Sequence, residues 1–218
     1  MLRWVRYGLF LLVAFALGFS IHLALQQMEQ QPSTKTAEST GKALIGGPFE
    51  LVNHKGETVT QADYAGKHML VFFGFTNCPD VCPAKLNSIS VALDRLGPLA
   101  DEVTPLFISV DPERDTPERV AQYVSNFSAQ IVGLTGTPEQ IRKAAGAYRA
   151  YYAKVDLEGS ASGYTMDHSA FTYLMDENGE YVTHFAYGDS IDKMAERLRR
   201  ELGGEKTAAH IGAAPAAQ

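Results

Sequence analysis

The sequence predicts an α/β domain in which helices pack on a mixed central β-sheet, and three observations support that prediction. Residues 49–52 and 57–60 are strand-like and flank Asn53-His54-Lys55-Gly56, so a hairpin is expected at the start of the domain. Apolar strand-like runs then alternate with segments of helical periodicity. A second hairpin, across the Asn178-Gly179 turn, and a final helix complete the domain.

The individual elements follow from periodicity and from turn residues. Two runs are almost continuously apolar, which is typical of strands covered on both faces: residues 68–75 and 103–110. Apolar residues at helical spacing, with Pro, Thr or Ser near the expected starts, predict four helices: residues 84–96, 117–127, 138–148 and 191–202. Shorter strands are expected at residues 131–134 and 151–155, the second at an edge of the sheet, and residues 169–176 and 181–187 are expected to pair as a hairpin.

Composition excludes some classes of function. The 218 residues suit one domain of ordinary size with appendages. Nineteen basic against 25 acidic side chains give a net charge of −6, and no basic patch with interleaved aromatics is present, so nucleic acid is not an expected partner. Two cysteines are too few for a disulfide scaffold, and their close spacing points to redox or metal chemistry.

Residues 1–25 have the pattern of a membrane anchor. Residues 7–25 contain no acid, Lys or Arg, and a helix of that length crosses the ~30 Å hydrocarbon core of a bilayer. Arg3 and Arg6 precede this run and no Lys or Arg follows until Lys35, so the positive-inside rule leaves the N-terminus in the cytoplasm. We therefore expect a single-pass protein of the bacterial inner membrane with its C-terminal domain in the periplasm. A cleaved signal sequence is the alternative.

The rest of the chain divides into three parts by composition. Residues 26–43 are polar and aperiodic, which predicts a flexible tether. Residues 44–202 hold all the predicted strands and helices and form the folded domain. Residues 203–218 are rich in Ala and Gly and are expected to be disordered.

The only two cysteines, Cys78 and Cys82, lie between the first buried strand and its helix, and each precedes a proline. A proline disfavours the α conformation for the residue before it, so both cysteines are expected to be extended. Either Pro79 or Pro83 is then expected to be the first helical residue. At least one sulfur should therefore lie at the positive end of the helix, where the thiolate is favoured. A redox-active disulfide pair, a metal site and a small structural disulfide all remain open on the spacing alone.

A cysteine pair between the first central strand and its helix is the organisation of thioredoxin-like folds, so a thioredoxin-like sandwich is expected. In that fold the loop before strand 169–176 lies opposite the cysteine loop. Thioredoxins have a cis-proline there, whereas this chain has His168 in that loop and no proline between Pro138 and Pro215. A histidine in that position favours metal binding over thiol exchange.

Two thiolates and one imidazole suit Cu(I) and tolerate Cu(II), and Zn(II) fits the same ligand types but prefers a fourth ligand. Four other residues offer possible metal ligands: His54, His68, His184 and Met166. His54, on a turn, and His68, at a strand start, are expected to be surface histidines, and His184 is expected to be structural. Met166 offers a thioether near His168, but packing under the site is the expected role.

Three motifs together resemble the Sco/SenC proteins: Phe75 to Pro83, Ser109 to Pro117, and Asp167-His168-Ser169. Those are membrane-anchored, thioredoxin-like copper proteins that help to assemble copper sites of cytochrome c oxidase. The resemblance covers residues 49–202 and the order of all three motifs. Met166 departs from it, because the family more often has a small branched residue there.

The resemblance implies that Cys78, Cys82 and His168 are copper ligands. It implies as partners the copper-site subunit of an oxidase and an upstream periplasmic copper donor. It also implies two jobs: delivery of copper to the binuclear oxidase site, or prior reduction of a disulfide there by the two cysteines. A metallochaperone and a thiol–disulfide oxidoreductase are therefore the two functional hypotheses. A peroxidase is not favoured, because no Pro-x-x-x-Thr-x-x-Cys pattern is present.

Asp111 and Asp115 are candidates for a supporting role. Asp111 ends the strand 103–110, whose end should open on the same edge as the cysteine loop, and Asp115 lies just before the helix that starts at Pro117. These acids would hydrogen-bond the site, hold charge near it or contact a partner; alternatively, they only cap turns and the helix N-terminus. Arg114 is expected to pair with one of them.

Overall fold

The computed structural model describes residues 44–128, 130–158 and 163–211. Its main feature is a seven-stranded sheet in the order β2-β1-β5-β4-β3-β8-β9. The strands are β1 (Glu50–Asn53), β2 (Thr58–Thr60), β3 (His68–Gly74), β4 (Val103–Ser109), β5 (Val132–Thr135), β8 (Thr172–Met175) and β9 (Tyr181–Phe185). β3 pairs in parallel with β4 and antiparallel with β8, and β4 pairs in parallel with β5. The mixed central sheet that the sequence predicts is therefore present.

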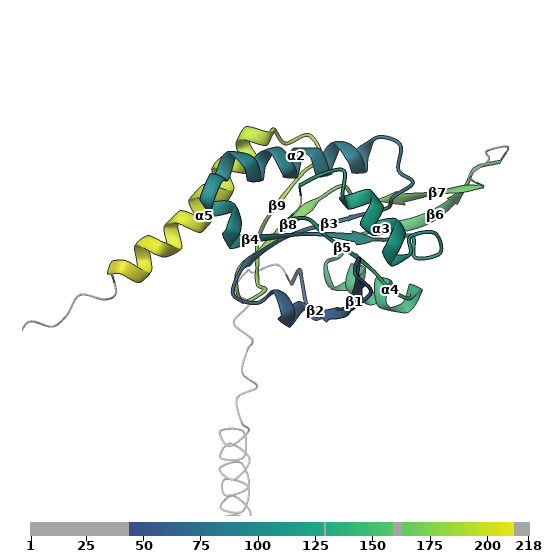
Figure 1. Ribbon diagram of the computed structural model, residues 1–218, viewed down its shortest axis with the longest axis horizontal. Helices are drawn as coiled ribbons and strands as arrows, with labels where there is room; N and C mark the ends of the chain where they lie inside the picture. Colours follow the sequence, from purple (N-terminus) through teal and green to yellow (C-terminus); the bar gives the residue numbers. More distant parts are fainter. Residues whose placement is uncertain (1–43, 129, 159–162, 212–218) are drawn as a thin grey trace, which may run out of the picture. The chain divides into compact units, whose positions relative to one another are not determined.

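Four helices cover the two faces of this sheet: α2 (Val81–Leu96), α3 (Pro117–Val124), α4 (Pro138–Ala147) and α5 (Ile191–Ile211). In Figure 1, α2 and α5 lie together over one face of the sheet and α4 lies on the other. Aromatic contacts follow the same division: Phe107 packs on Tyr123 of α3 with ring centroids 5.4 Å apart, and Phe73 packs on Tyr148 at the end of α4 at 5.5 Å. All seven residues of β3 are buried, as its continuous apolar run predicts.

The remaining two strands, β6 (Tyr152–Asp156) and β7 (Tyr164–His168), form a separate antiparallel pair. In Figure 1 this hairpin extends beyond the edge of the seven-stranded sheet. The edge strand predicted at 151–155 is therefore a strand, but it does not join the seven-stranded sheet, and the loop predicted before strand 169–176 is mostly the strand β7. Tyr164 and Met166 alternate with the polar Thr165 and Asp167, but a run of five residues is too short for this pattern to separate a strand from a loop.

Three further expectations are corrected. α2 begins at Val81, so Cys82 is helical, and neither proline is the first helical residue. Pro83 is tolerated because the first N–H groups of a helix have no partner within it. His68, expected on the surface, is only 4% exposed because it opens the central strand. α5 continues past residue 202 to Ile211, beyond the end that the sequence predicts.

Within the described residues, no helix is both long and apolar enough to cross a bilayer. The predicted span at 7–25 and the predicted tether at 26–43 lie outside the described residues.

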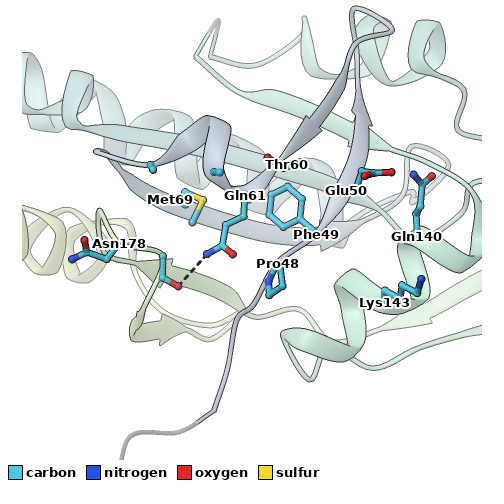
Figure 2. Close-up of a pocket in the computed structure, with 12 residues that line it drawn as sticks. Pro48, Phe49, Glu50, Thr60, Gln61, Met69, Gln140, Lys143 and Asn178 are labelled. Atoms are coloured by element: carbon cyan, nitrogen blue, oxygen red, sulfur yellow. Dashed lines mark hydrogen bonds between the residues drawn. The ribbon is translucent and has the colours of Figure 1, made fainter.

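A cavity of about 690 Å³ lies near the start of β3, at the opposite end of that strand from the cysteines (Figure 2). Phe49, Met69 and Pro48 form an apolar part of its wall, and Gln61 donates to the Gly179 carbonyl oxygen at 3.3 Å beside it. Its lining includes neither Cys nor His. The soft-ligand chemistry of the chain is therefore at the other end of the sheet.

Candidate metal centre

Cys78, Cys82 and His168 meet at the carboxyl end of β3. Cys78 lies in the loop after β3, Cys82 in the first turn of α2, and His168 at the end of β7. Their donor atoms all lie within 4.8 Å of one another, and Cys82 Sγ is 3.4 Å from His168 Nε2. Both cysteines are free thiols. The tertiary structure thus brings together the three residues that the sequence singles out.

The cysteine loop places one sulfur directly at the N-terminus of α2. The backbone N–H of Cys82 donates to Cys78 Sγ at 3.4 Å, and the N–H of Cys78 donates to the Phe75 carbonyl oxygen at 3.4 Å. The Asp80 side chain, at the N-cap position, makes no capping hydrogen bond, so the Cys78 sulfur takes part of that role. A helix N-terminus favours negative charge, and the sulfur that it favours is Cys78.

Gly74, the last residue of β3, makes room for the second sulfur. A Cβ added at Gly74 would lie 2.9 Å from Cys82 Sγ and 2.9 Å from Phe107 Cε2. The backbone of β3 and the sulfur are thus in direct contact. Cys82 is completely buried, whereas Cys78 is partly exposed.

These environments shift the pKa values of the two thiols in opposite directions. The hydrogen bond from the Cys82 thiol lowers the pKa of Cys78 to about 4, and the hydrogen bond from the Cys82 backbone N–H acts in the same direction against the effect of burial. The pKa of Cys82 is raised, because its thiol donates to Cys78 and is buried. The first proton therefore leaves Cys78, and the second is retained by Cys82 until a metal or a base removes it.

His168 is oriented by contacts on several sides. Its Nδ1 lies 3.0 Å from the Ser169 carbonyl oxygen. A carbonyl oxygen only accepts, so Nδ1 carries the hydrogen and the Nε2 lone pair is directed to the sulfurs. The ring packs edge-on against Phe72 at 6.0 Å and Phe75 at 5.7 Å between centroids. This is the arrangement that holds an imidazole ready for a metal.

Asp115 fixes the cysteine loop and does not approach the sulfurs as a ligand. It is fully buried and accepts three hydrogen bonds, from the Thr76 N–H at 2.9 Å, the Thr76 hydroxyl at 2.6 Å and the Ser109 hydroxyl at 2.6 Å. Arg119 Nε donates to the same Thr76 hydroxyl at 2.9 Å. Asp115 therefore joins the end of β4 to the start of the cysteine loop.

Asp111 turns toward β7 instead. It is 2% exposed, pairs with Arg114 and accepts from the Tyr164 hydroxyl at 2.8 Å. Neither acid caps α3, because Thr116 does so by accepting from the Arg119 N–H at 3.3 Å. The prediction that these acids cap the N-terminus of α3 is therefore wrong, whereas their supporting role at the site stays a prediction.

Other candidates lie at the edge of the centre or away from it. Met166 and His168 line a cavity of about 270 Å³ beside Cys78, and Met166 packs against the core. His54 Nδ1 accepts from the Gly133 N–H at 3.0 Å, which ties the first hairpin to β5. His184 is exposed and contacts the Tyr181 hydroxyl at 2.5 Å. Neither of these two histidines reaches the sulfurs.

Sequence reasoning missed Gly74 and Tyr164. Gly74 interrupts an otherwise apolar strand, which is a sign of close approach by another group. Tyr164 carries no such sign, because its role depends on Asp111, 53 positions earlier in the chain.

Fold and site together define a class of protein: a thioredoxin-like α/β domain with two cysteine sulfurs and an imidazole at the end of its sheet, suited to a soft metal ion. A family model described as SCO1/SenC matches residues 37–203. The chain belongs to that family, and the resemblance seen in the sequence is confirmed.

Similar proteins of known sequence belong to the same family. The human mitochondrial SCO1 homolog is 40% identical over 198 residues, 88% of this chain and 65% of the relative. The mitochondrial SCO1 homolog 1 of Arabidopsis thaliana is 40% identical over 171 residues, 78% of this chain and 51% of the relative. The chain thus spans about half to two thirds of the length of these two proteins. The SCO2-like protein RP587 of Rickettsia prowazekii is 40% identical, with 73% of this chain and 78% of the relative covered.

Solved structures carry the same fold. Copper-bound ScoI of Bradyrhizobium japonicum is 46% identical with a TM-score of 0.66, covering 72% of this chain and 98% of that one. Copper-bound ScoI of Arabidopsis thaliana is 40% identical with a TM-score of 0.69, covering 73% of this chain and 99% of that one. These comparisons support copper as the metal for the Cys–Cys–His group of this chain.

Proposed function

We propose that this protein is a copper carrier that delivers copper to a copper centre of cytochrome c oxidase during assembly, with Cys78, Cys82 and His168 as ligands. One observation carries the proposal: three soft or borderline donor atoms lie within 4.8 Å of one another. Thiolates select Cu(I), and imidazole suits both copper oxidation states. The copper-bound relatives support the same metal.

Each ligand has a distinct part in loading. Cys78, the thiolate of the pair, is the first attachment point, since it is partly exposed and lines the 270 Å³ cavity. Cys82 then loses its thiol proton, because the metal competes with the proton for the sulfur. Its thiolate binds the metal from the buried side of the site. His168 supplies a neutral nitrogen through Nε2. Three ligands leave copper open to a fourth, so a sulfur of an acceptor protein can bind before a ligand of this chain leaves.

The proposal places the protein in the bacterial inner membrane. Residues 7–25 would anchor it, residues 26–43 would act as the tether, and residues 44–202 would reach partners in the periplasm, with 203–218 as a tail. Its partners would be the copper-site subunit of the oxidase and an upstream periplasmic copper donor.

A second candidate function is reduction of a disulfide in that oxidase subunit. It is favoured by the contrast between Cys78, a partly exposed thiol with a pKa of about 4, and buried Cys82. Cys78 sulfur would attack the partner disulfide, forming a mixed disulfide and releasing one partner thiolate. Cys82, losing its proton, would then attack Cys78 sulfur and release the second. The partner gains two electrons and the Cys78–Cys82 pair becomes a disulfide.

Copper titration of the reduced full-length protein tests these functions. The carrier function predicts one Cu(I) per chain, held against a competing chelator, and thiolate-to-Cu(II) charge-transfer bands that change in His168→Ala. Absence of stoichiometric Cu(I) binding would overturn it. The reductase function predicts disulfide exchange that survives His168→Ala and is lost in Cys78→Ser.

A further inference from the structure

The metal centre spans two parts of the domain. Both cysteines belong to the body built on the seven-stranded sheet, whereas His168 belongs to the β6–β7 hairpin. Among the described strands, β6 and β7 are hydrogen-bonded only to each other, and in Figure 1 they extend away from the body. The distance between the imidazole and the sulfurs therefore depends on what attaches this hairpin to the body.

The bonds at the base of the hairpin do not attach it to the body. The Ser169 N–H donates to the Tyr151 carbonyl oxygen at 2.9 Å, and the Tyr151 N–H donates to the Ser169 hydroxyl at 2.8 Å. These bonds join the two arms of the hairpin to each other next to His168. Met166 and the His168 ring pack against the body at this end of β7, and polar side chains attach the strand at its other end.

Asp111, Arg114 and Tyr164, here termed the Arg114 cluster, make the polar attachment at the Tyr164 end of β7. The Tyr164 hydroxyl donates to Asp111 Oδ1 at 2.8 Å, and Arg114 Nη1 donates to the Tyr164 carbonyl oxygen at 3.0 Å. Arg114 Nε also pairs with Asp111 Oδ2. The guanidinium carbon lies 3.7 Å from the centroid of the Tyr164 ring.

Arginine is required at the centre of this cluster. One planar group donates to a carboxylate with one nitrogen and to a carbonyl with another while its face covers an aromatic ring, and lysine does not do all three. Both charges are withdrawn from solvent, since the side chains of Arg114 and Asp111 are 19% and 2% exposed. Burial and the hydrogen bond to Asp111 raise the pKa of Tyr164 to about 12, so the hydroxyl remains a donor at neutral pH.

An outer pair lies over the same ring and serves as an internal comparison. Lys154 of β6 lies 4.0 Å from the Tyr164 ring centroid and pairs with Glu113 at 2.6 Å. The two side chains are 43% and 60% exposed, so solvent and salt weaken this pair. The Lys154–Glu113 pair therefore contacts Tyr164 without taking part in the buried hydrogen bonds of the Arg114 cluster.

We propose that the Arg114 cluster is a positioning device for His168, and that it sets how well the imidazole completes the copper site. Tyr164 and His168 are four residues apart on one face of β7, a span of ~13 Å along the strand. The cluster holds one end of the strand, and the ring contacts to Phe72 and Phe75 hold the other. Loosening the first end leaves His168 held only by contacts near its own end of the strand, which are its ring contacts and the packing of Met166 against the core.

This inference rests on the proposed copper site and makes a selective prediction. Cu(I) is held chiefly by the two thiolates, which lie on the body, whereas Cu(II) depends more on the imidazole. Groups that orient a metal ligand change affinity by roughly 10–100-fold when removed. Loss of the cluster should therefore weaken Cu(II) binding about tenfold and Cu(I) binding less.

Three variants of the full-length protein test the inference. Tyr164→Phe removes one hydroxyl, Arg114→Lys keeps the charge and loses the planar group, and Lys154→Met removes only the outer pair. Two measurements are made: hydrogen exchange of the β6 and β7 amides without metal, and Cu(II) and Cu(I) affinity with the thiolate-to-Cu(II) bands. Tyr164→Phe and Arg114→Lys should give faster exchange in the hairpin, weaker Cu(II) binding and shifted bands. Lys154→Met should resemble the wild type.

Two results would overturn the positioning role: unchanged hairpin exchange in Tyr164→Phe and Arg114→Lys, or faster exchange with unchanged Cu(II) affinity. Faster exchange in β3 of Arg114→Lys would show that this substitution destabilises the whole domain. In that case only Tyr164→Phe tests the positioning role. The metal-free measurement does not depend on copper. A wild type that takes up no copper would therefore refute the proposed function while the exchange data still report on the cluster.

Discussion

The two parts that form the metal centre differ in how they are built. The cysteine loop is attached to a buried strand, a helix and the fully buried Asp115, so both sulfurs belong to the rigid core. The hairpin that carries His168 is a separate two-stranded sheet joined to the body by side chains. A site built in this way can hold copper firmly on one side and adjust it on the other. Changes in the body should therefore affect folding and all copper binding, and changes in the hairpin chiefly the contribution of the imidazole.

The largest effect on the body is expected from Asp115→Ala. The change leaves three donors, from Thr76 and Ser109, without their acceptor inside the protein. Each unsatisfied buried group costs about 1–3 kcal/mol, so a loss of about 3 kcal/mol or more in the free energy of unfolding is expected. Denaturant unfolding measures it. A loss below about 1 kcal/mol would show that the cysteine loop is not held by this carboxylate.

A smaller loss is expected from Gly74→Ala. The added Cβ would meet Cys82 Sγ and Phe107, each at 2.9 Å, so the sulfur must move. Such overpacking costs about 1–3 kcal/mol, and Cu(I) affinity should fall with it. Gly146→Ala is the matched control, because no atom outside its own helix lies within 4 Å of the new Cβ. The control should gain up to about 1 kcal/mol of stability, and equal behaviour of the two variants would contradict the packing argument.

The two cysteines should ionise and react with alkylating reagents in different pH ranges. Its folded pKa of about 4 lies below its ordinary value of 9.0, so its thiolate stabilises the reduced fold above pH 9 and this contribution is lost as pH falls toward 4. The raised pKa of Cys82 acts oppositely at alkaline pH. Iodoacetamide should modify Cys78 down to about pH 5 and leave Cys82 unmodified. Cys82→Ser should alter the Cys78 profile most, because the Cys82 hydrogen bond is the largest cause of the shift.

The smallest effect on folding is expected from the hairpin. His168→Ala removes two edge-on ring contacts, each worth about 0.5–1.5 kcal/mol, from a site near the surface. We expect a loss of about 1 kcal/mol in the free energy of unfolding, with retained Cu(I) binding through the cysteines. A loss as large as that of Asp115→Ala would mean that the hairpin is part of the core, and the contrast between the two parts would fail.

The sequence by itself determined the α/β pattern, the buried strands and the three meeting residues. Local periodicity reports burial, and a histidine where thioredoxins have proline pointed to metal. Both features can be recognised in the sequence alone, because the first depends on neighbours in the chain and the second on one position of a known fold. The hairpins at residues 49–60 and 172–185 were predicted for the same reason, since turn residues act locally.

Only the tertiary structure decided how the ligands are held. Asp115 reaches Thr76 across 39 positions, and Tyr164 reaches Asp111 across 53, and no local pattern encodes such pairs. The start of α2 at Val81 and the strand character of β7 were likewise decided by pairing and packing. Periodicity shows which side chains are buried, but the contacts between buried groups depend on how distant segments come together.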